Sequence, residues 1–154
     1  MNELLKDGIF KKIIIGRSYL CSINLRNDKA VYLLILNEIK KKEKFLKKNK
    51  KFSEIIPILE KIKSGFKVYT TLALNDSLIF VLDYINDKDA IINKYPAIKK
   101  LNPVFYDRDS FCDTLIKDDT LVEDKVILYA YETYFELVES VEDKLRLKRN
   151  KLFK

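Results

Sequence analysis

Histidine is absent from this chain, and glycine, proline and cysteine are scarce among its 154 residues. Without histidine, the sequence lacks the usual general base of catalytic triads, the usual pH switch near neutrality and the usual zinc ligand. The three glycines, Gly8, Gly16 and Gly65, stand alone, whereas phosphate-cradling loops need closely spaced glycines. These absences exclude histidine-based triads and the common nucleotide-binding motifs.

Long apolar runs are missing as well. The longest, Ala30 to Leu36, has seven residues, far fewer than the ~20 that a membrane-spanning helix needs. The N-terminal stretch carries acidic residues early and only "III" as a continuous apolar core, which is too short for a signal peptide. We therefore expect a cytoplasmic protein that does not enter a membrane, whose two cysteines, Cys21 and Cys112, are free thiols.

Composition and length favour one globular domain. Hydrophobic residues make up 47% and charged residues 34% of the chain, which is typical of neither disordered nor fibrous proteins. We find no Ser/Gly-rich linker and no repeat of solenoid length. We predict a single α+β domain over residues 1–154, in which a mainly antiparallel sheet of about four or five strands packs with helices.

Two segments have the pattern of β-strands. In residues 18–25, "SYLCSINL", apolar and polar side chains largely alternate, which is the period of a half-buried strand. In residues 66–85, two apolar, β-branched runs flank "NDS", which has the turn chemistry of a hairpin. Because both faces of these two runs are largely apolar, we expect them to be central strands.

The stretch "AVYLLILNEI" that begins at Ala30 is ambiguous. Its β-branched and aromatic side chains favour a strand over residues 30–37, whereas Asp28 could also cap a helix with one apolar stripe. We expect a strand for 30–37, followed by a helix for 38–50, where lysine and glutamate are good helix formers.

Shorter elements are expected in the middle of the chain. Residues 52–65 have the apolar spacing of a helix that ends at Gly65. A short helix over 87–95 is interrupted by Pro96. Residues 101–111, "LNPVFYDRDSF", are expected to form a loop.

The last periodic segment is the longest. "TLVE" at residues 120–123 fits a capping box, and acidic residues gather at the start and basic residues at the end, as the helix dipole favours. We predict a long amphipathic helix over 120–150, which at 1.5 Å per residue would extend roughly 45 Å and could project from the domain. Its apolar stripe recurs at spacings of four and three and consists of Ile127, Tyr131, Tyr134, Val138, Val141 and Leu145.

The basic charge of the chain is concentrated in "KKKEKFLKKNKK", residues 40–51. This run has a net charge of +7, and so does the whole chain, so the other residues sum to zero. A local basic patch suits a phosphate backbone, but lysine, unlike arginine, lacks the planar fork that reads base edges. A solvated helical face is therefore the favoured interpretation of the run, and a patch for nucleic acid or another polyanion is the alternative. The candidate nucleic-acid-binding residues are Lys40, Lys41, Lys42, Lys44, Lys47, Lys48, Lys50 and Lys51.

Acidic residues are the remaining catalytic candidates. Asp107, Asp109 and Asp113 could gather around a magnesium ion, although turn-forming and helix-capping aspartates explain the same pattern. The charge of Asp113 opposes thiolate formation at the adjacent Cys112. We therefore predict no catalytic residue, no metal and no cofactor, and keep a metal-dependent nuclease or nucleotidyl enzyme as a minor alternative.

The sequence accordingly favours a non-catalytic interaction protein, such as an adaptor, inhibitor or regulator. The predicted partner interface is the apolar stripe of the 120–150 helix, through which the chain would bind a protein partner or form a homodimer. The alternative is a sequence-nonspecific nucleic-acid-binding protein that uses the eight lysines of residues 40–51.

Overall fold

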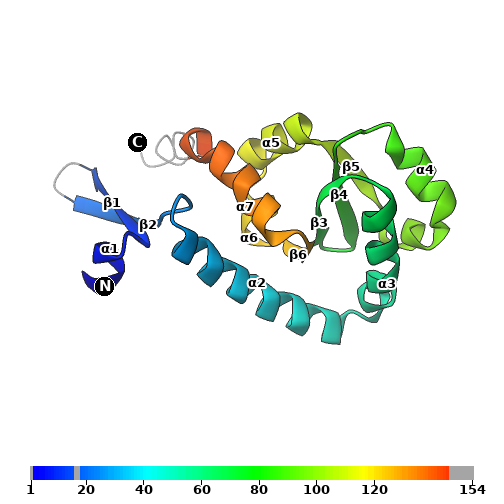
Figure 1. Ribbon diagram of the computed structural model, residues 1–154, viewed down its shortest axis with the longest axis horizontal. Coiled ribbons are helices and arrows are strands. Elements are labelled where there is room, and N and C mark those ends of the chain that lie inside the picture. Colours follow the sequence, from blue (N-terminus) through cyan, green and yellow to red (C-terminus); the bar gives the residue numbers. More distant parts are fainter. Residues whose placement is uncertain (1, 16–17, 146–154) are drawn as a thin grey trace.

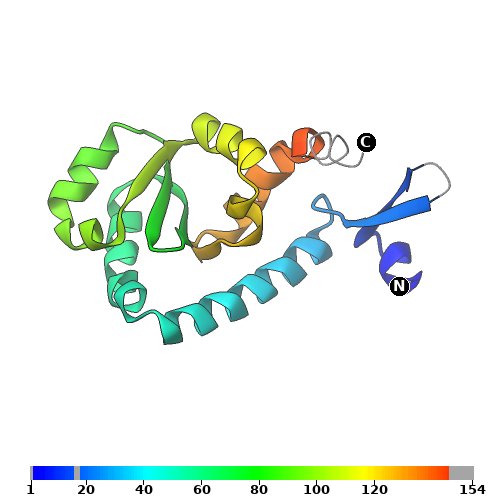
Figure 2. The ribbon, with the colours of Figure 1, turned by 180° about the vertical axis from the view of Figure 1, so that it is seen from behind.

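The computed structural model describes residues 2–15 and 18–145 and combines helices with two sheets (Figures 1 and 2). A two-stranded hairpin lies beyond the N-terminal end of the longest helix, α2 (Asp28–Lys48), and a four-stranded sheet lies along the side of that helix. The mixed helix and sheet content agrees with the predicted α+β class. Within the described ranges, no helix is both long enough and apolar enough to cross a membrane.

The N-terminal part of the chain precedes α2 and consists of α1 (Asn2–Lys6) and a hairpin of β1 (Phe10–Ile15) and β2 (Ser18–Ile23). Asparagine side chains connect this part to the segment that leads into α2. The two strands pair antiparallel, which confirms the strand predicted near residues 18–25. Asn24 Nδ2 donates to the carbonyl of Gly8 at 2.9 Å, and Asn27 Nδ2 donates to the carbonyl of Asp7 at 3.0 Å. Gly8 has a φ of 69°, a left-handed conformation that glycine adopts easily.

The larger sheet has the strand order β5, β4, β3, β6. Its strands are β3 (Val68–Leu74), β4 (Ser77–Leu82), β5 (Val104–Asp107) and β6 (Val126–Tyr129). The predicted hairpin is confirmed as β3 and β4, the two central strands, with Asn75 left-handed at its turn (φ 53°). β3 pairs antiparallel with β4 and β6, but β5 runs parallel to β4. The sheet is therefore mixed, and the prediction of a mainly antiparallel sheet is not confirmed.

Helices cover both faces of this sheet. One face carries α3 (Lys50–Gly65), α4 (Asp87–Lys94) and the 3₁₀ helix η1 (Pro96–Leu101), and the other carries α5 (Arg108–Lys117) and α7 (Tyr131–Ser140). Because side chains alternate along a strand, Ile79 and Val81 pack toward α5 and α7, whereas Phe80 and Leu82 pack toward α3 and α4. All four are buried.

Helix α2 runs past the outer edge of β6, and its two halves join different apolar clusters. The prediction of a strand over residues 30–37 was wrong. The side chain of Asn27 caps the helix by accepting a hydrogen bond from the amide of Ala30 at 3.2 Å. Ala30, Ile35 and Glu38 are buried along one helical side, so packing with α7 and β6 outweighs the strand propensity of the segment.

The predicted continuous helix over 120–150 is wrong for its described part. Residues up to 145 instead form α6 (Thr120–Glu123), β6, α7 and a final helical turn, while 146–150 lie outside the described residues. Two features of the structure are incompatible with a continuous helix over this segment. β6 pairs with β3 and completes the sheet, and Ala130 adopts a left-handed φ of 58° between β6 and α7. The predicted capping box is absent, because the Thr120 hydroxyl donates to Asp118 Oδ1 instead.

The two helices predicted in the middle of the chain are confirmed, whereas the loop predicted after them is not. α3 and α4 match the helices predicted over 52–65 and 87–95. The predicted loop over 101–111 was wrong, because it contains β5 and the start of α5. A four-residue strand has too few residues to show a clear period, so its pairing with β4 decides its conformation.

Candidate interaction surfaces

An exposed apolar patch lies on the N-terminal half of α2. Tyr32, Leu33 and Leu36, which we call the α2 patch, are 62%, 50% and 56% exposed. Leu36 follows Leu33 by three residues and Tyr32 by four, so it shares a side of the helix with each of them. The opposite side, with Ala30 and Ile35, is buried, so the segment is apolar on more sides than its own fold covers. Large apolar side chains that are exposed next to one another are typical of interaction sites.

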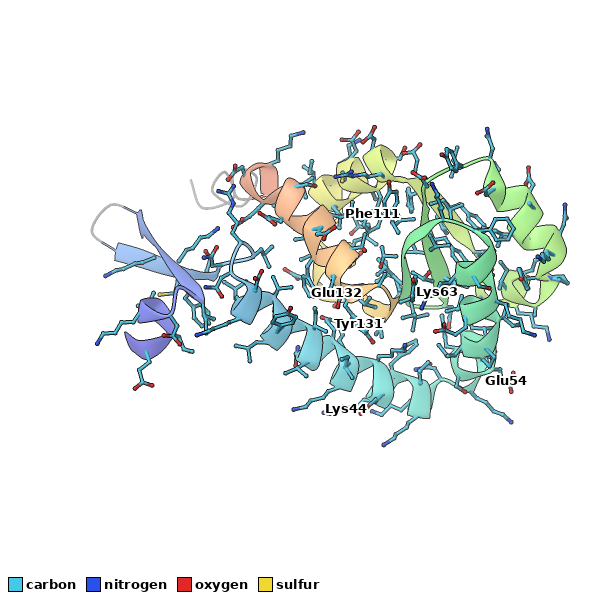
Figure 3. All side chains as sticks on the ribbon, viewed as in Figure 1. Lys44, Glu54, Lys63, Phe111, Tyr131 and Glu132 are labelled. Carbon is cyan, nitrogen blue, oxygen red and sulfur yellow. The ribbon has the colours of Figure 1, made fainter. Side chains whose placement is uncertain are left out.

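A cleft of about 360 Å³ separates this half of α2 from α7. Tyr32 and Phe135 contribute apolar surface to it, and Glu132, Glu136 and Glu139 line its α7 side. Figure 3 shows Glu132 and Tyr131 at the start of α7, on the side that faces α2. Glu139 is paired with Arg26 across the cleft, with an oxygen to Nε distance of 3.4 Å. The cleft therefore combines an apolar floor with an acidic wall.

The eight lysines predicted to bind nucleic acid divide into two groups. Lys41 Nζ donates to the carbonyl of Glu123 at 3.2 Å, and Lys42 Nζ donates to the carbonyl of Leu128 at 2.6 Å. These two bonds reach residues at and beside the outer edge of β6, where they occupy carbonyl groups that no strand pairs. Burial lowers the pKa of Lys42, and nearby Glu60 partly offsets this effect. Lys41 and Lys42 thus hold α2 on the sheet.

The other six lysines are exposed around the corner between α2 and α3. Figure 3 shows Lys44 on the outer side of α2, pointing away from the sheet. Lys50 lies 3.9 Å from Glu54, one turn along α3, an exposed ion pair that contributes little to stability. The exposed group consists of Lys40, Lys44, Lys47, Lys48, Lys50 and Lys51.

The six residues of the predicted partner interface pack within this chain. Ile127, Tyr134, Val138 and Val141 are buried at 0% to 8% exposure, and Tyr131 and Leu145 pack partly buried against the same cluster. Ile127 belongs to β6, so it does not share a helix with the others. These side chains form the core beneath α7 and offer no continuous exposed surface to a partner.

A buried ionic network, which the sequence did not reveal, joins α2 to the segment around β6. Lys125 Nζ donates to Glu38 Oε1 at 3.0 Å and to the carbonyl of Val122 at 2.9 Å, and both charged side chains are less than a tenth exposed. Burial lowers the pKa of Lys125, and the charge of Glu38 partly offsets that shift. Charge pairs of this kind leave no period in a sequence, because they join residues 87 positions apart.

Tyr134 closes this network from α7. Its hydroxyl donates to the carbonyl of Leu121 at 2.8 Å, and Lys125 Nζ lies 5.1 Å from the centre of its ring. Burial, together with the charge of Glu38, raises the pKa of Tyr134 far above its ordinary value. The network is structural, since its groups are enclosed between α2, β6 and α7 rather than in the cleft.

Of the three aspartates considered as magnesium ligands, one caps α5 and two lie within that helix. Asp107 is the N-cap of α5 and accepts a hydrogen bond from the amide of Ser110 at 2.7 Å, and this bond lowers the pKa of its carboxyl group. Asp109 and Asp113 follow on α5 itself. In the part of the chain that the structure describes, no three histidine, cysteine or acidic side chains are placed to hold a metal ion.

Comparisons with protein-family models, with curated proteins and with solved structures gave no match to this chain. The sequence signal for the α2 patch was present in "VYLLIL", because a helix there has more apolar positions than one buried face needs.

Proposed function

We propose that this is a non-catalytic interaction protein of the cytoplasm, which binds a protein partner through the α2 patch and the adjoining acidic cleft. The observation that carries the proposal is the contiguous exposure of Tyr32, Leu33 and Leu36 on one helix side. Monomeric proteins seldom leave such a group uncovered unless it meets a partner. The proposed interface therefore lies on α2 and not on the predicted apolar stripe of the 120–150 segment, four of whose six residues are buried.

A pair of equally exposed tyrosines provides a matched test. Tyr32 belongs to the α2 patch, whereas Tyr84, 58% exposed, lies after β4 and distant from it along the chain. Wild type, Tyr32→Gln combined with Leu36→Lys, and Tyr84→Gln would each be immobilised and exposed to a lysate of the source cells. We expect at least one protein to be retained by wild type and Tyr84→Gln and lost by the patch variant. Identical sets of retained proteins would reject the proposal.

A second candidate function is binding of nucleic acid without sequence specificity. It is favoured by the six exposed lysines around the α2 to α3 corner, because phosphate contacts need accessible cations. If all six contacted duplex phosphates, the logarithm of affinity would fall with the logarithm of salt concentration at a slope of roughly −5. Lys41 and Lys42 are excluded from this estimate because they bind backbone carbonyls.

Fluorescence anisotropy with labelled duplex DNA, single-stranded DNA and RNA tests this candidate. A variant with Lys40, Lys44, Lys47 and Lys48 changed to glutamine should lose most binding. A control of equal charge, with glutamine at four exposed lysines elsewhere, should bind like wild type; its sites are Lys61, Lys88, Lys99 and Lys100. Equal loss in both variants would show that only net charge matters, and a flat salt dependence would dismiss the candidate.

A further inference from the structure

One line of exposed side chains runs along the outer side of α2. On an ideal helix, Leu33 and Leu36 lie within about 80° of the lysines that precede and follow them on this side. Each of these side chains is exposed, and Figure 3 shows Lys44 pointing away from the sheet. We call this surface the outer line, and its members are Lys29, Leu33, Leu36, Lys40, Lys44 and Lys47.

The outer line changes from apolar to basic toward the C-terminal end of α2. On an ideal helix, Lys40 lies about 6 Å beyond Leu36, and the next two lysines of the line lie about 12 and 17 Å beyond it. Glu43, an exposed acidic residue of this half, lies at the edge of the helix that it shares with Tyr32. Since Tyr32 borders the cleft, this edge is the one turned toward α7. The three lysines therefore present their charge on the side of α2 that faces away from the cleft.

The N-terminal end of the outer line is less basic. Lys29 is exposed, and its Nζ lies 3.8 Å from Asp7 Oδ2. This ion pair partly offsets the charge of Lys29. The outer line therefore has a direction, because strong positive charge follows its apolar part on one side only.

We propose that the partner at the α2 patch is an acidic amphipathic helix of another protein, an inference that rests on the proposed function. Its apolar side chains cover the α2 patch, and its aspartates or glutamates lie opposite Lys40, Lys44 and Lys47. Two packed helices have the same rise per residue, so these acids follow the partner's apolar residues at the spacings that separate the three lysines from Leu36. The apolar contacts supply affinity, and the charge pairs fix the direction of the partner.

The backbone of α2 favours a helical partner over an extended one. An extended peptide gains affinity from main-chain hydrogen bonds to an open sheet edge. Within a helix such as α2, the backbone groups are already bonded to one another. Recognition along the outer line therefore depends on side chains, which a second helix presents on one side at matching intervals.

Other occupants match the outer line less well. A second copy turned about a two-fold axis between Leu33 and Leu36 would set Lys40 opposite Lys29, and an axis parallel to α2 would set each lysine against its own counterpart. A nucleic-acid backbone would pair with the lysines but would leave the α2 patch uncovered. The patch spans only about one helical turn, whereas helices that lie on a membrane bury an extended apolar face. An acidic amphipathic helix matches both parts of the line.

A library of displayed helical peptides tests the partner class on the full chain. The surface positions of the peptides vary among leucine, alanine, glutamate and lysine, and helices are selected for binding to wild type. We expect the selected helices to combine adjacent leucines with glutamates at the spacings given above. Fluorescence anisotropy then compares their binding to wild type, to the patch variant (Tyr32→Gln with Leu36→Lys) and to two charge variants.

The first charge variant, the outer-line variant, changes Lys40→Glu, Lys44→Glu and Lys47→Glu. We expect the selected helices to bind it at least about tenfold more weakly than wild type. Peptides in which lysine replaces each glutamate should bind the outer-line variant again, and this recovery also shows that the variant is folded. The second charge variant should bind the selected helices like wild type, because it makes the same change at three exposed lysines outside α2. Its sites are Lys61, Lys88 and Lys99.

The selection separates the partner class from the proposed function. If the selected helices need the α2 patch but contain glutamate no more often than lysine, the acidic partner is overturned and the proposed function stands. An equal loss of binding in both charge variants would also overturn the acidic partner, since net charge alone would explain it. If no selected helix needs the patch, the partner class is wrong. In that case the proposed function stands only if the patch variant still loses a protein captured from the lysate.

Vesicles of phosphatidylserine and phosphatidylcholine provide the last comparison. We expect wild type to show no binding to them that depends on the α2 patch. Vesicle binding that is lost in both the patch variant and the outer-line variant would assign this surface to an anionic membrane and overturn the proposal.

Discussion

Two segments of this chain, residues 28–48 and 120–145, share apolar residues at spacings of three and four, yet they fold differently. The first is one 21-residue helix, and the second is a short helix, a strand and a helix. In β6, Val126 and Leu128 face one cluster while Ile127 faces the other. A strand buried on both faces therefore has apolar residues at every position, and such a run fits a helical spacing as well.

The comparison shows that local periodicity did not decide either segment. Helix α2 persists although its β-branched residues favour a strand, since Asn27 caps it and one of its sides is covered by α7 and β6. The 120–145 segment leaves the helix because β3 offers an open edge with which Val126 to Tyr129 can pair. Four sets of substitutions test this account, in order of decreasing expected effect.

The largest effect is expected where the two segments meet. Lys125→Met leaves the carboxylate of Glu38 buried without its cation, which typically costs about 3 to 5 kcal/mol of unfolding free energy. The double variant Glu38→Leu with Lys125→Met removes both charges and should recover most of that loss. Urea denaturation of the three proteins measures both values. A single variant as stable as wild type would mean that the pair is not buried in solution.

Two truncations compare Ile127, from the predicted apolar stripe, with Leu36, from the segment that was predicted to be a strand. Ile127→Ala should destabilise the protein by about 2 to 5 kcal/mol, because Ile127 is fully buried in the sheet. Leu36→Ala should change stability by less than about 0.5 kcal/mol, because Leu36 is exposed on α2. Thermal unfolding measures the loss of stability at each position. Similar losses at both positions would contradict the burial described here.

Tyr134→Phe removes the hydroxyl that binds the carbonyl of Leu121 and should cost about 1 to 2 kcal/mol near neutral pH. The pKa of Tyr134 is raised in the folded state, so above its ordinary value of 10.0 the folded protein keeps a proton that the unfolded chain has lost. Stability from this group is therefore complete below pH 10 and falls as pH rises further. The difference in unfolding free energy between wild type and Tyr134→Phe should shrink above pH 10, by up to about 1.4 kcal/mol per pH unit.

This comparison isolates Tyr134 from Lys125, whose lowered pKa acts in the opposite direction. The folded protein releases the Lys125 proton before the unfolded chain does, so this group alone would make stability rise with pH up to about 10.5. Because both proteins in the comparison contain Lys125, its contribution cancels. A difference that stays constant above pH 10 would show that the Tyr134 hydroxyl ionises as freely in the folded state as in the unfolded state.

The smallest effects concern the two helix starts. Asn27→Ala removes the side-chain cap of α2 and should cost about 1 kcal/mol. Thr120→Ala should cost less than about 0.5 kcal/mol, because the Thr120 hydroxyl is bonded to Asp118 in an exposed turn and does not cap a long helix. Chemical denaturation at neutral pH compares them. A larger loss at Thr120 than at Asn27 would favour the capping box that the sequence suggested.

Several features could be predicted from residues alone because their causes are local. The turn "NDS" supplied the left-handed Asn75 that closes β3 and β4, and the apolar runs around it required burial on both faces. α3 and α4 carried their own helical period. The candidate surfaces were harder to find, because exposure is a property of what packs nearby. The lysine run contained both exposed lysines and lysines that hold α2 on β6, and nothing in its letters separated the two kinds.

The sequence by itself determined the mixed class, the central hairpin, the local concentration of basic charge and the absence of histidine chemistry, since these depend on composition and on neighbouring residues. Tertiary structure alone decided that 30–37 is helical, that Val126 to Tyr129 is a strand, and that Tyr32, Leu33 and Leu36 remain uncovered. The physical reason is that an apolar run gains the same free energy from burial in either conformation. Which side it buries, and against which strand or helix, depends on partners that are distant in the chain.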